Sequence, residues 1–514
     1  MSDLRQMRHK TERHRFDFRK PLNGNCKMAK ETLEKSAELC IGALSQAALD
    51  YKARYIKLQQ EKVPDILKLT AELRMDILFI QIDLCTSFIA CCKAEKPYAC
   101  RYHIKNLYAG MQEAFKLLHG YGKSQHYTIW TKIGESINGK PTSEWREQPQ
   151  LESLYKIVSA KLNGLSGTEV DKVHRDLTYH YDCDMKRVYS YTLETNNLEK
   201  ASSQYCAYLE VLTGMTQLCD EMESCLRNRK VSTAVEIDSP LIDNGSHLFL
   251  IQYLSKNKEL PIVLEGILND IKPIDDYALQ LDKFDKLNGL VSNTIELPEI
   301  DNILVILNMQ LTIYFMRADM AAITQSFLLS KTSGESILNM RRYIITITAA
   351  FSHLYGYSED EQSKSIWASI MSMIPEDATT LKENATNISN ILKKVVLNDD
   401  MNARTCYAHL YDNKTRKTNV PSIIDLLLKQ DPIKEIQKVT IMLKVTKLVI
   451  DFSTILMDEL SIRAREAREK STEDLKTTLL KIKGFTELPN CPIKLKEMLC
   501  ETIGKVQGMT GIII

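Results

Sequence analysis

One pattern occurs twice in this chain, and the repeat limits the folds it can adopt more than any other feature. Residues 104–121 (IKNLYAGMQEAFKLLHGY) align without a gap with residues 340–357 (MRRYIITITAAFSHLYGY), and both segments end in Gly-Tyr. A tryptophan follows each segment, at Trp130 and Trp367. Self-similarity at a large, nearly constant spacing is typical of a duplicated architecture. The sequence therefore predicts two diverged copies of one domain.

The repeated segments lie among long amphipathic stretches. Apolar residues recur at three and four positions, without Pro or Gly, over residues 44–58, 76–92 and 439–463. This spacing is typical of helices that bury one face. Strand-like alternation is nearly absent, with one candidate at residues 230–237 (KVSTAVEI). The expected fold class is all-α, with two tandem helical bundles, and the Gly of each Gly-Tyr pair is expected to end its helix in the left-handed conformation.

The length of the chain also favours more than one domain. At 514 residues it exceeds what a single hydrophobic core usually supports. We place the first copy at residues 31–235 and the second at residues 236–514. Residues 1–30 form a basic arm, with nine Lys or Arg against three acids. Such a run is typical of a solvated tail or of an arm that touches a polyanion, and both interpretations stay open.

Composition excludes several classes of protein. The 67 basic and 66 acidic residues give no overall field that would attract nucleic acid. The 13 cysteines show no CxxC and no Cys/His spacing suited to zinc, so we expect reduced thiols, no metal and no cofactor. Charged residues interrupt the apolar runs, namely Asp83 in one and Arg317 with Asp319 in another. We therefore expect a cytoplasmic protein that does not span a membrane and has no membrane partner.

A short motif occurs at the corresponding point of each copy. It consists of an Arg, four residues and a His, at Arg175 to His180 (RDLTYH) and at Arg404 to His409 (RTCYAH). These are the only two occurrences of this spacing, and a Tyr and an Asp follow each of them. The position within the repeat, more than the spacing itself, makes the two motifs the main functional candidates.

Arg and His together suit the cleavage of a phosphodiester. The guanidinium group can bind two phosphate oxygens and stabilise the charge that develops on them. The imidazole can accept a proton from a ribose 2′-hydroxyl or donate one to the leaving oxygen. Five residues turn through about 140° on a helix, so the Arg and His of one motif do not share a face. Two motifs that meet across an intramolecular pseudo-dimer would supply a complete site with two histidines.

The duplicated motif resembles that of the HEPN superfamily, in which an Arg, four to six residues and a His often include a polar residue directly after the Arg. The resemblance covers the motifs and the helical repeats around them. It implies helical bundles that dimerise to form a metal-independent RNase leaving 2′,3′-cyclic phosphate ends. Members act as toxins, as abortive-infection proteins and in RNA-guided defence. The resemblance implies that the catalytic residues are Arg175, His180, Arg404 and His409.

The same resemblance assigns supporting roles and partners. Asp176 would be the polar residue that orients the site, whereas Thr405 stands at that position in the second motif. The acids that follow the motifs, Asp182 and Asp412, would lie around the catalytic residues and help to orient them. The expected partners are an RNA substrate and an inhibitor, antitoxin or activating protein, and the sequence also allows a homo-oligomer. The biological role would be antiviral defence or growth arrest.

Other interpretations remain open on sequence alone. The neighbouring tyrosines either stack on unpaired bases or serve as amphipathic packing residues, and they are Tyr179, Tyr181, Tyr407 and Tyr411. The Arg–His pairs could instead tie helix ends in a non-catalytic binding or scaffold protein, with duplication explaining why they occur twice. A phosphate-binding loop, a zinc-protease motif and a serine-hydrolase elbow are all missing from the sequence.

Overall fold

The computed structural model describes ten segments of the chain. They are residues 24–120, 128–138, 149–165, 198–228, 258–270, 272–291, 298–395, 406–412, 417–488 and 491–510. Within them the expected all-α fold class is confirmed, since the only strands are two of two residues each. The arm up to residue 23 and the candidate strand at 230–237 lie outside these segments. Helix α2 already begins at Gly24, within the region assigned to the arm.

The first half of the chain is arranged around one largely buried helix. Helix α3 packs against α2, α4 and α9, and α6 packs against α9. The apolar stretch at residues 76–92 lies in α3 and is buried along almost its whole length. The helices of this half are α2 (Gly24–Gln60), α3 (Asp65–Lys93), α4 (Pro97–Leu118), α5 (Ile129–Asn138), α6 (Pro149–Leu165) and α9 (Leu198–Asn228).

The second half repeats this arrangement around α13, which packs against α12, α14 and α20, while α17 packs against α20. A short antiparallel hairpin pairs Tyr411 with Thr418. The elements are α11 (Glu259–Asn269), α12 (Lys272–Val291), α13 (Pro298–Leu328), α14 (Ser333–Leu354), α15 (Glu359–Ser363), α16 (Ile366–Ser372), α17 (Thr379–Lys394), β1 (Tyr411–Asp412), β2 (Lys417–Thr418), α19 (Val420–Leu428), α20 (Pro432–Thr486) and α21 (Ile493–Thr510).

The aligned segments form equivalent helices with equivalent ends. Helix α4 is followed by Gly120 at φ 75° and α14 by Gly356 at φ 86°, so the predicted left-handed glycines are confirmed. Each glycine N–H donates to the carbonyl five residues earlier, on Phe115 or Phe351.

The two tryptophans also occupy equivalent places. The indole N–H of Trp130 donates to the Ser159 hydroxyl on α6 at 3.0 Å. That of Trp367 donates to Ser389 on α17 at 2.8 Å. Each tryptophan therefore makes the same kind of hydrogen bond, to a serine on the helix α6 or α17 of its own half.

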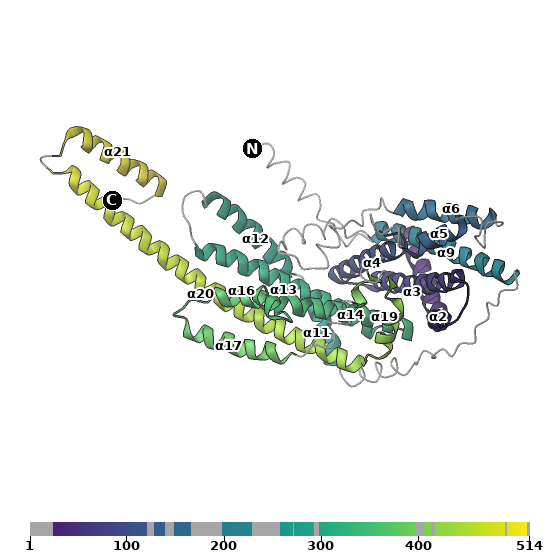
Figure 1. Cartoon of the computed structure of the whole chain (residues 1–514). Helices are drawn as coiled ribbons and strands as arrows, with labels where there is room; N and C mark the ends of the chain where they lie inside the picture. The colour runs from purple at the N-terminus through teal and green to yellow at the C-terminus, as the bar shows by residue number, and fades with distance from the viewer. Residues whose placement is uncertain are drawn as a thin grey trace.

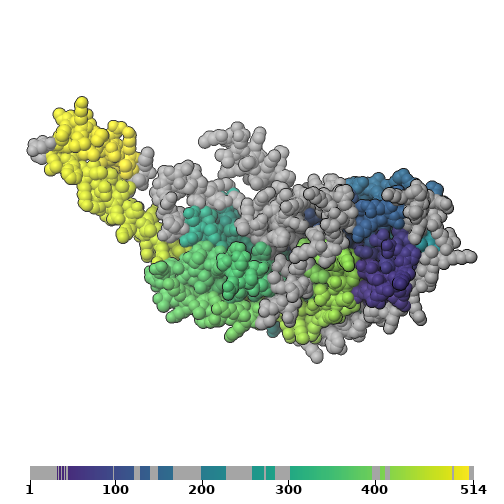
Figure 2. Space-filling model, in the orientation of Figure 1, coloured from purple at the N-terminus to yellow at the C-terminus, as the bar shows by residue number. Residues whose placement is uncertain are grey.

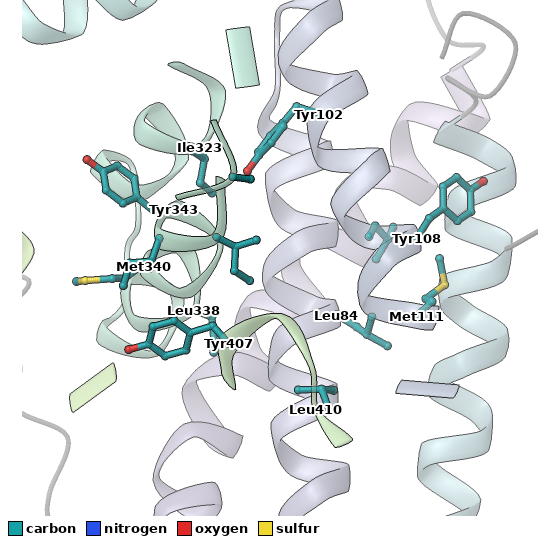
Figure 3. Packing of buried hydrophobic residues seen from close by; sticks show 14 of the residues in the cluster. Leu84, Tyr102, Tyr108, Met111, Ile323, Leu338, Met340, Tyr343, Tyr407 and Leu410 are labelled. Atoms are coloured by element: carbon teal, nitrogen blue, oxygen red, sulfur yellow. The ribbon is translucent and has the colours of Figure 1, made fainter. Parts of the chain in front are cut away.

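The two halves share one contiguous hydrophobic core. Helix α4 of the first half packs against α13, and α14 of the second half packs against α3. Figure 3 shows the segment with Tyr407 and Leu410 packed beside Leu338 and Leu84. In Figure 1 these helices form the body, from which the far part of α20 and α21 project as a separate hairpin. The central region of the molecule is therefore built from both halves of the chain.

Two described helices are long and apolar enough to cross a membrane by length and composition, namely α3 and residues 301–328 of α13. The most apolar windows of these helices are 94% and 67% buried inside the protein. Core helices of this kind pass the same test, because packing between bundles demands apolar residues on several faces.

Candidate composite site between the two halves

The contact between the halves contains charged side chains inside apolar helices. Asp83 on α3 accepts hydrogen bonds from Arg341 at 2.8 Å and from Arg342 at 2.7 Å, both on α14. All three side chains are almost completely buried. Burial alone would raise the pKa of Asp83, but the Arg342 and Arg341 guanidinium groups outweigh it and the pKa is lowered. Asp83 is therefore a carboxylate that binds the second half to the first.

A second buried ion pair also joins the two halves, but here the first half supplies the cation and the second half supplies the acid. Lys105 on α4 donates to Asp319 on α13 at 2.9 Å. Burial lowers the pKa of Lys105 and Asp319 partly offsets this effect. Lys105 and Arg341 are 236 residues apart, as are Asp83 and Asp319 and the two glycines that end α4 and α14. Each half thus gives an acid to a cation of the other, and a two-fold interface generates reciprocal contacts of this kind.

The second Arg–His motif is anchored to this buried network. The Arg341 guanidinium, besides binding Asp83, donates its Nε–H to the backbone carbonyl of Tyr407 at 2.8 Å. The side chain of Asn419 donates to the carbonyl of His409 at 2.9 Å. Arg341 therefore links the first half directly to the segment that carries His409.

His409 faces a glutamate from the other half. Its Nδ1 lies 3.5 Å from Oε1 of Glu113 on α4, with 45% of the His409 side chain and 10% of the Glu113 side chain exposed. The atoms are close enough for an ion pair but are not aligned as a hydrogen bond. Burial raises the pKa of Glu113, whereas His409, Lys116 and Arg341 lower it, and the net direction is down. The carboxylate of Glu113 therefore faces the His409 ring from the other half of the chain.

The strand that follows His409 is held against α3. Thr418 donates its hydroxyl hydrogen to Oδ1 of the fully buried Asp76 at 2.8 Å. Burial and the nearby Glu72 raise the pKa of Asp76 well above its ordinary range, although Thr418 opposes this shift. The segment from Tyr407 to Thr418 is thus attached to both α3 and α14.

Most of the predicted site residues cannot be placed. The whole first motif, with Arg175, Asp176, Tyr179, His180, Tyr181 and Asp182, lies outside the described residues, as do Arg404 and Thr405 of the second. Only the backbone of Tyr411 is described. Asp412 is half-buried, and its charge contributes to the raised pKa of Cys406, mainly caused by burial. The convergence of the two motifs in one cleft therefore stays a prediction.

One predicted RNA contact is wrong. The ring of Tyr407 is completely buried, and its hydroxyl accepts a hydrogen bond from Gln430 at 3.3 Å. A ring without exposed surface cannot stack on a base. For Tyr407 the packing interpretation is the correct one, because the side chain belongs to the hydrophobic core and lies beside Leu338 of α14 (Figure 3).

Sequence reasoning did not assign Glu113 to the site, nor did it identify the buried partners of Asp83 and Asp319. Asp83 and Asp319 were recognisable as charges inside apolar runs, which need buried partners of opposite charge. Glu113 is aligned with Ala349 in the repeat, so a departure from the repeat marks it.

Among the described residues no group of three or more His, Cys, Asp or Glu side chains could hold a metal ion. No family model, curated protein or solved structure matches the chain.

Proposed function

We propose that the chain is a metal-independent endoribonuclease of the HEPN type, with two helical bundles packed as an intramolecular pseudo-dimer. The observation that carries the proposal is the position of His409, which is half-exposed at the contact between the halves and faces Glu113 of the other half. The reciprocal pairs of Asp83 with Arg341 and of Lys105 with Asp319 support the two-fold packing.

In this proposal the two motifs share the chemistry. One histidine accepts the proton of a ribose 2′-hydroxyl and the other donates a proton to the leaving 5′-oxygen. Arg175 and Arg404 bind the phosphate and stabilise the charge on its oxygens. Glu113 is a positioning residue that acts through His409. The products are a 2′,3′-cyclic phosphate and a 5′-hydroxyl end.

A nuclease of this kind has to be restrained in the cell, so the proposal includes an inhibitor, antitoxin or activating partner and a role in antiviral defence or growth arrest. The expected compartment is the cytoplasm, where RNA substrates and reduced thiols occur together.

The first experiment tests cleavage in the presence of EDTA. Mixed tRNA and single-stranded RNA are incubated with the wild-type chain and with His180→Ala, His409→Ala and the double variant. We expect cleavage by the wild type and loss of about a hundredfold or more in each single variant, because each histidine serves one proton transfer. His353→Ala on α14, a histidine outside both motifs, is the control and should cleave as the wild type does.

The outcomes separate the alternatives. Loss in both single variants supports a site shared by the two motifs, and loss in His180→Ala alone assigns the chemistry to the first motif. Unchanged cleavage in the double variant contradicts the assignment of these residues.

The second candidate function is a non-catalytic binding or scaffold protein. It is favoured by the structural use of the second motif, since Tyr407 is a core residue and its carbonyl holds Arg341. A wild-type chain that binds RNA or protein but cleaves none of the RNAs, with and without cell extract as a source of activator, would favour this candidate.

A further inference from the structure

Helix α20 extends well beyond the body of the protein. Its buried residues run without a long break up to Leu460, and farther along only Leu479 and Thr486 are buried. Helix α21 folds back along this far part and contributes the buried Ile503. Figures 1 and 2 show the resulting hairpin, coloured yellow, projecting from the body. It has no described contact with the composite site.

The part of α20 between the body and the end of the hairpin is polar. No large apolar side chain is exposed between Arg463 and Thr478. Exposed Arg and Glu residues dominate its first part and polar residues most of the rest, and the stretch reads RAREAREKSTEDLKTT. This polar stretch has the composition of a solvated helix, so it needs no partner.

Apolar exposure returns abruptly at the end of the hairpin. We define the hairpin tip as residues 480–488 and 491–498. Phe485 is 61% exposed and Ile493 is 77% exposed. Four further apolar residues of the tip are exposed, namely Leu480, Leu488, Leu495 and Met498. Scattered apolar residues are normal on a protein surface, but a group beyond a polar stalk marks an interaction surface.

The same tip presents unpaired positive charge. It carries four exposed lysines, at positions 481, 483, 494 and 496, against Glu487 and Glu497. Among the described residues none of these four ammonium groups has an acidic partner within 4.0 Å. Elsewhere on the two helices Lys447, Lys476 and Lys505 each have an acidic partner three or four residues away. The four tip lysines therefore lack the kind of acidic partner that Lys476 and Lys505 have elsewhere on the hairpin.

Apolar side chains interleaved with unpaired lysines fit one kind of partner best. A second copy of the tip would bring the eight lysines together, and like charges in contact oppose association. An anionic bilayer offers hydrocarbon for Phe485 and Ile493 and phosphate groups for the lysines. We propose that the hairpin tip is a peripheral binding surface for an anionic lipid membrane. The polar stretch of α20 then holds the body of the protein at a distance from that membrane.

The test is co-sedimentation of the full chain with lipid vesicles. Vesicles of phosphatidylcholine alone are compared with vesicles that also contain phosphatidylglycerol. We expect the wild type to bind the anionic vesicles and to be released by high salt, because screening weakens the lysine contribution. Phe485→Ser with Ile493→Ser, and separately Lys483→Glu with Lys494→Glu, should each weaken binding by about tenfold or more.

The matched control is Ile262→Ser on α11, another strongly exposed isoleucine outside the tip. It should bind vesicles as the wild type does. Since all the substituted side chains are exposed, each variant should keep the wild-type melting temperature.

Two results would overturn the proposal. The first is a wild type that ignores anionic vesicles or loses no binding in the tip variants. The second is a dimer, seen by analytical ultracentrifugation, that the Phe485→Ser and Ile493→Ser pair dissolves, because the apolar tip would then serve a second copy of the chain.

Discussion

Single charged side chains inside apolar helices determine how the two halves contact each other. Asp83 pairs with the guanidinium groups of Arg341 and Arg342, and Asp319 pairs with the ammonium group of Lys105. A buried ion pair contributes little relative to apolar packing, but removal of one partner leaves an uncompensated charge in the core. These positions are therefore sensitive to substitution although they add only modestly to stability.

We predict that Asp83→Asn lowers the free energy of unfolding by about 3–5 kcal/mol, because two buried guanidinium groups lose their counter-ion. Urea denaturation measures this loss. Glu152→Gln, which removes an exposed pair with Lys156, is the control and should cost less than about 1 kcal/mol. An Asp83→Asn loss no larger than that of the control would show that the pair is not buried in solution.

A pH effect follows from His103, which is completely buried on α4 and hydrogen-bonded to Ser326 at 2.9 Å. Burial, helped by Arg342, lowers its pKa to about 3. Below pH about 6.5 the unfolded chain binds a proton at this histidine and the folded chain does not, so stability falls as the pH drops from 6.5 toward 3.

We predict that between pH 7 and pH 5 the wild type loses about 2 kcal/mol more stability than His103→Gln, whose side chain does not titrate. Urea denaturation of both proteins at both pH values provides the measurement. Parallel pH dependences would mean that His103 is accessible to protons in the folded chain.

These side chains show how far the sequence could predict the site. An isolated Asp in an apolar run requires a cation, so a buried pair at Asp83 was foreseeable, but its partner on α14 was not. Burial of Tyr407 was also unpredictable, because a Tyr has an apolar ring and a polar hydroxyl that suit a core or a surface equally. The contact of Glu113 with His409 depends on tertiary packing, which a short motif does not encode.

The positions of individual helices were more predictable than the identity of the helices that pack against them. Apolar periodicity predicted the central parts of helices α2, α3 and α20 but not their full lengths, and the Gly-Tyr pairs marked the ends of α4 and α14. Periodicity shows that a helix has an apolar face but not which helix covers it. The contacts of α4 with α13 and of α14 with α3 were therefore known only after the structure.

The glycine that ends α14 supports a prediction about this element. Gly356 has φ 86°, and a Cβ there would lie 2.6 Å from the backbone of Glu361 and of Gln362. Gly356→Ala should therefore lower the free energy of unfolding by about 1–3 kcal/mol. The control is Gly266→Ala in α11, where a Cβ meets no atom within 4 Å and should stabilise the helix by about 0.5–1 kcal/mol. Thermal denaturation distinguishes the two, and equal changes would exclude the proposed strain at Gly356.

Over the whole molecule, the body and the projecting hairpin should behave as separate parts. The residues by which α20 packs on the body end near Leu460, so a chain that stops after Arg465 keeps them all. We predict that this truncation changes the melting temperature of the body by less than about 3 °C. Calorimetry measures it, and a larger decrease would reveal contacts between the hairpin and the body.

The reciprocal contacts between the halves belong to one polypeptide, and this affects how the protein responds to dilution. Two separate subunits part when their concentration falls below the dissociation constant. Covalent linkage instead holds two partners at an effective concentration in the millimolar range, whatever the abundance of the chain. The cell therefore cannot switch this interface by making less protein.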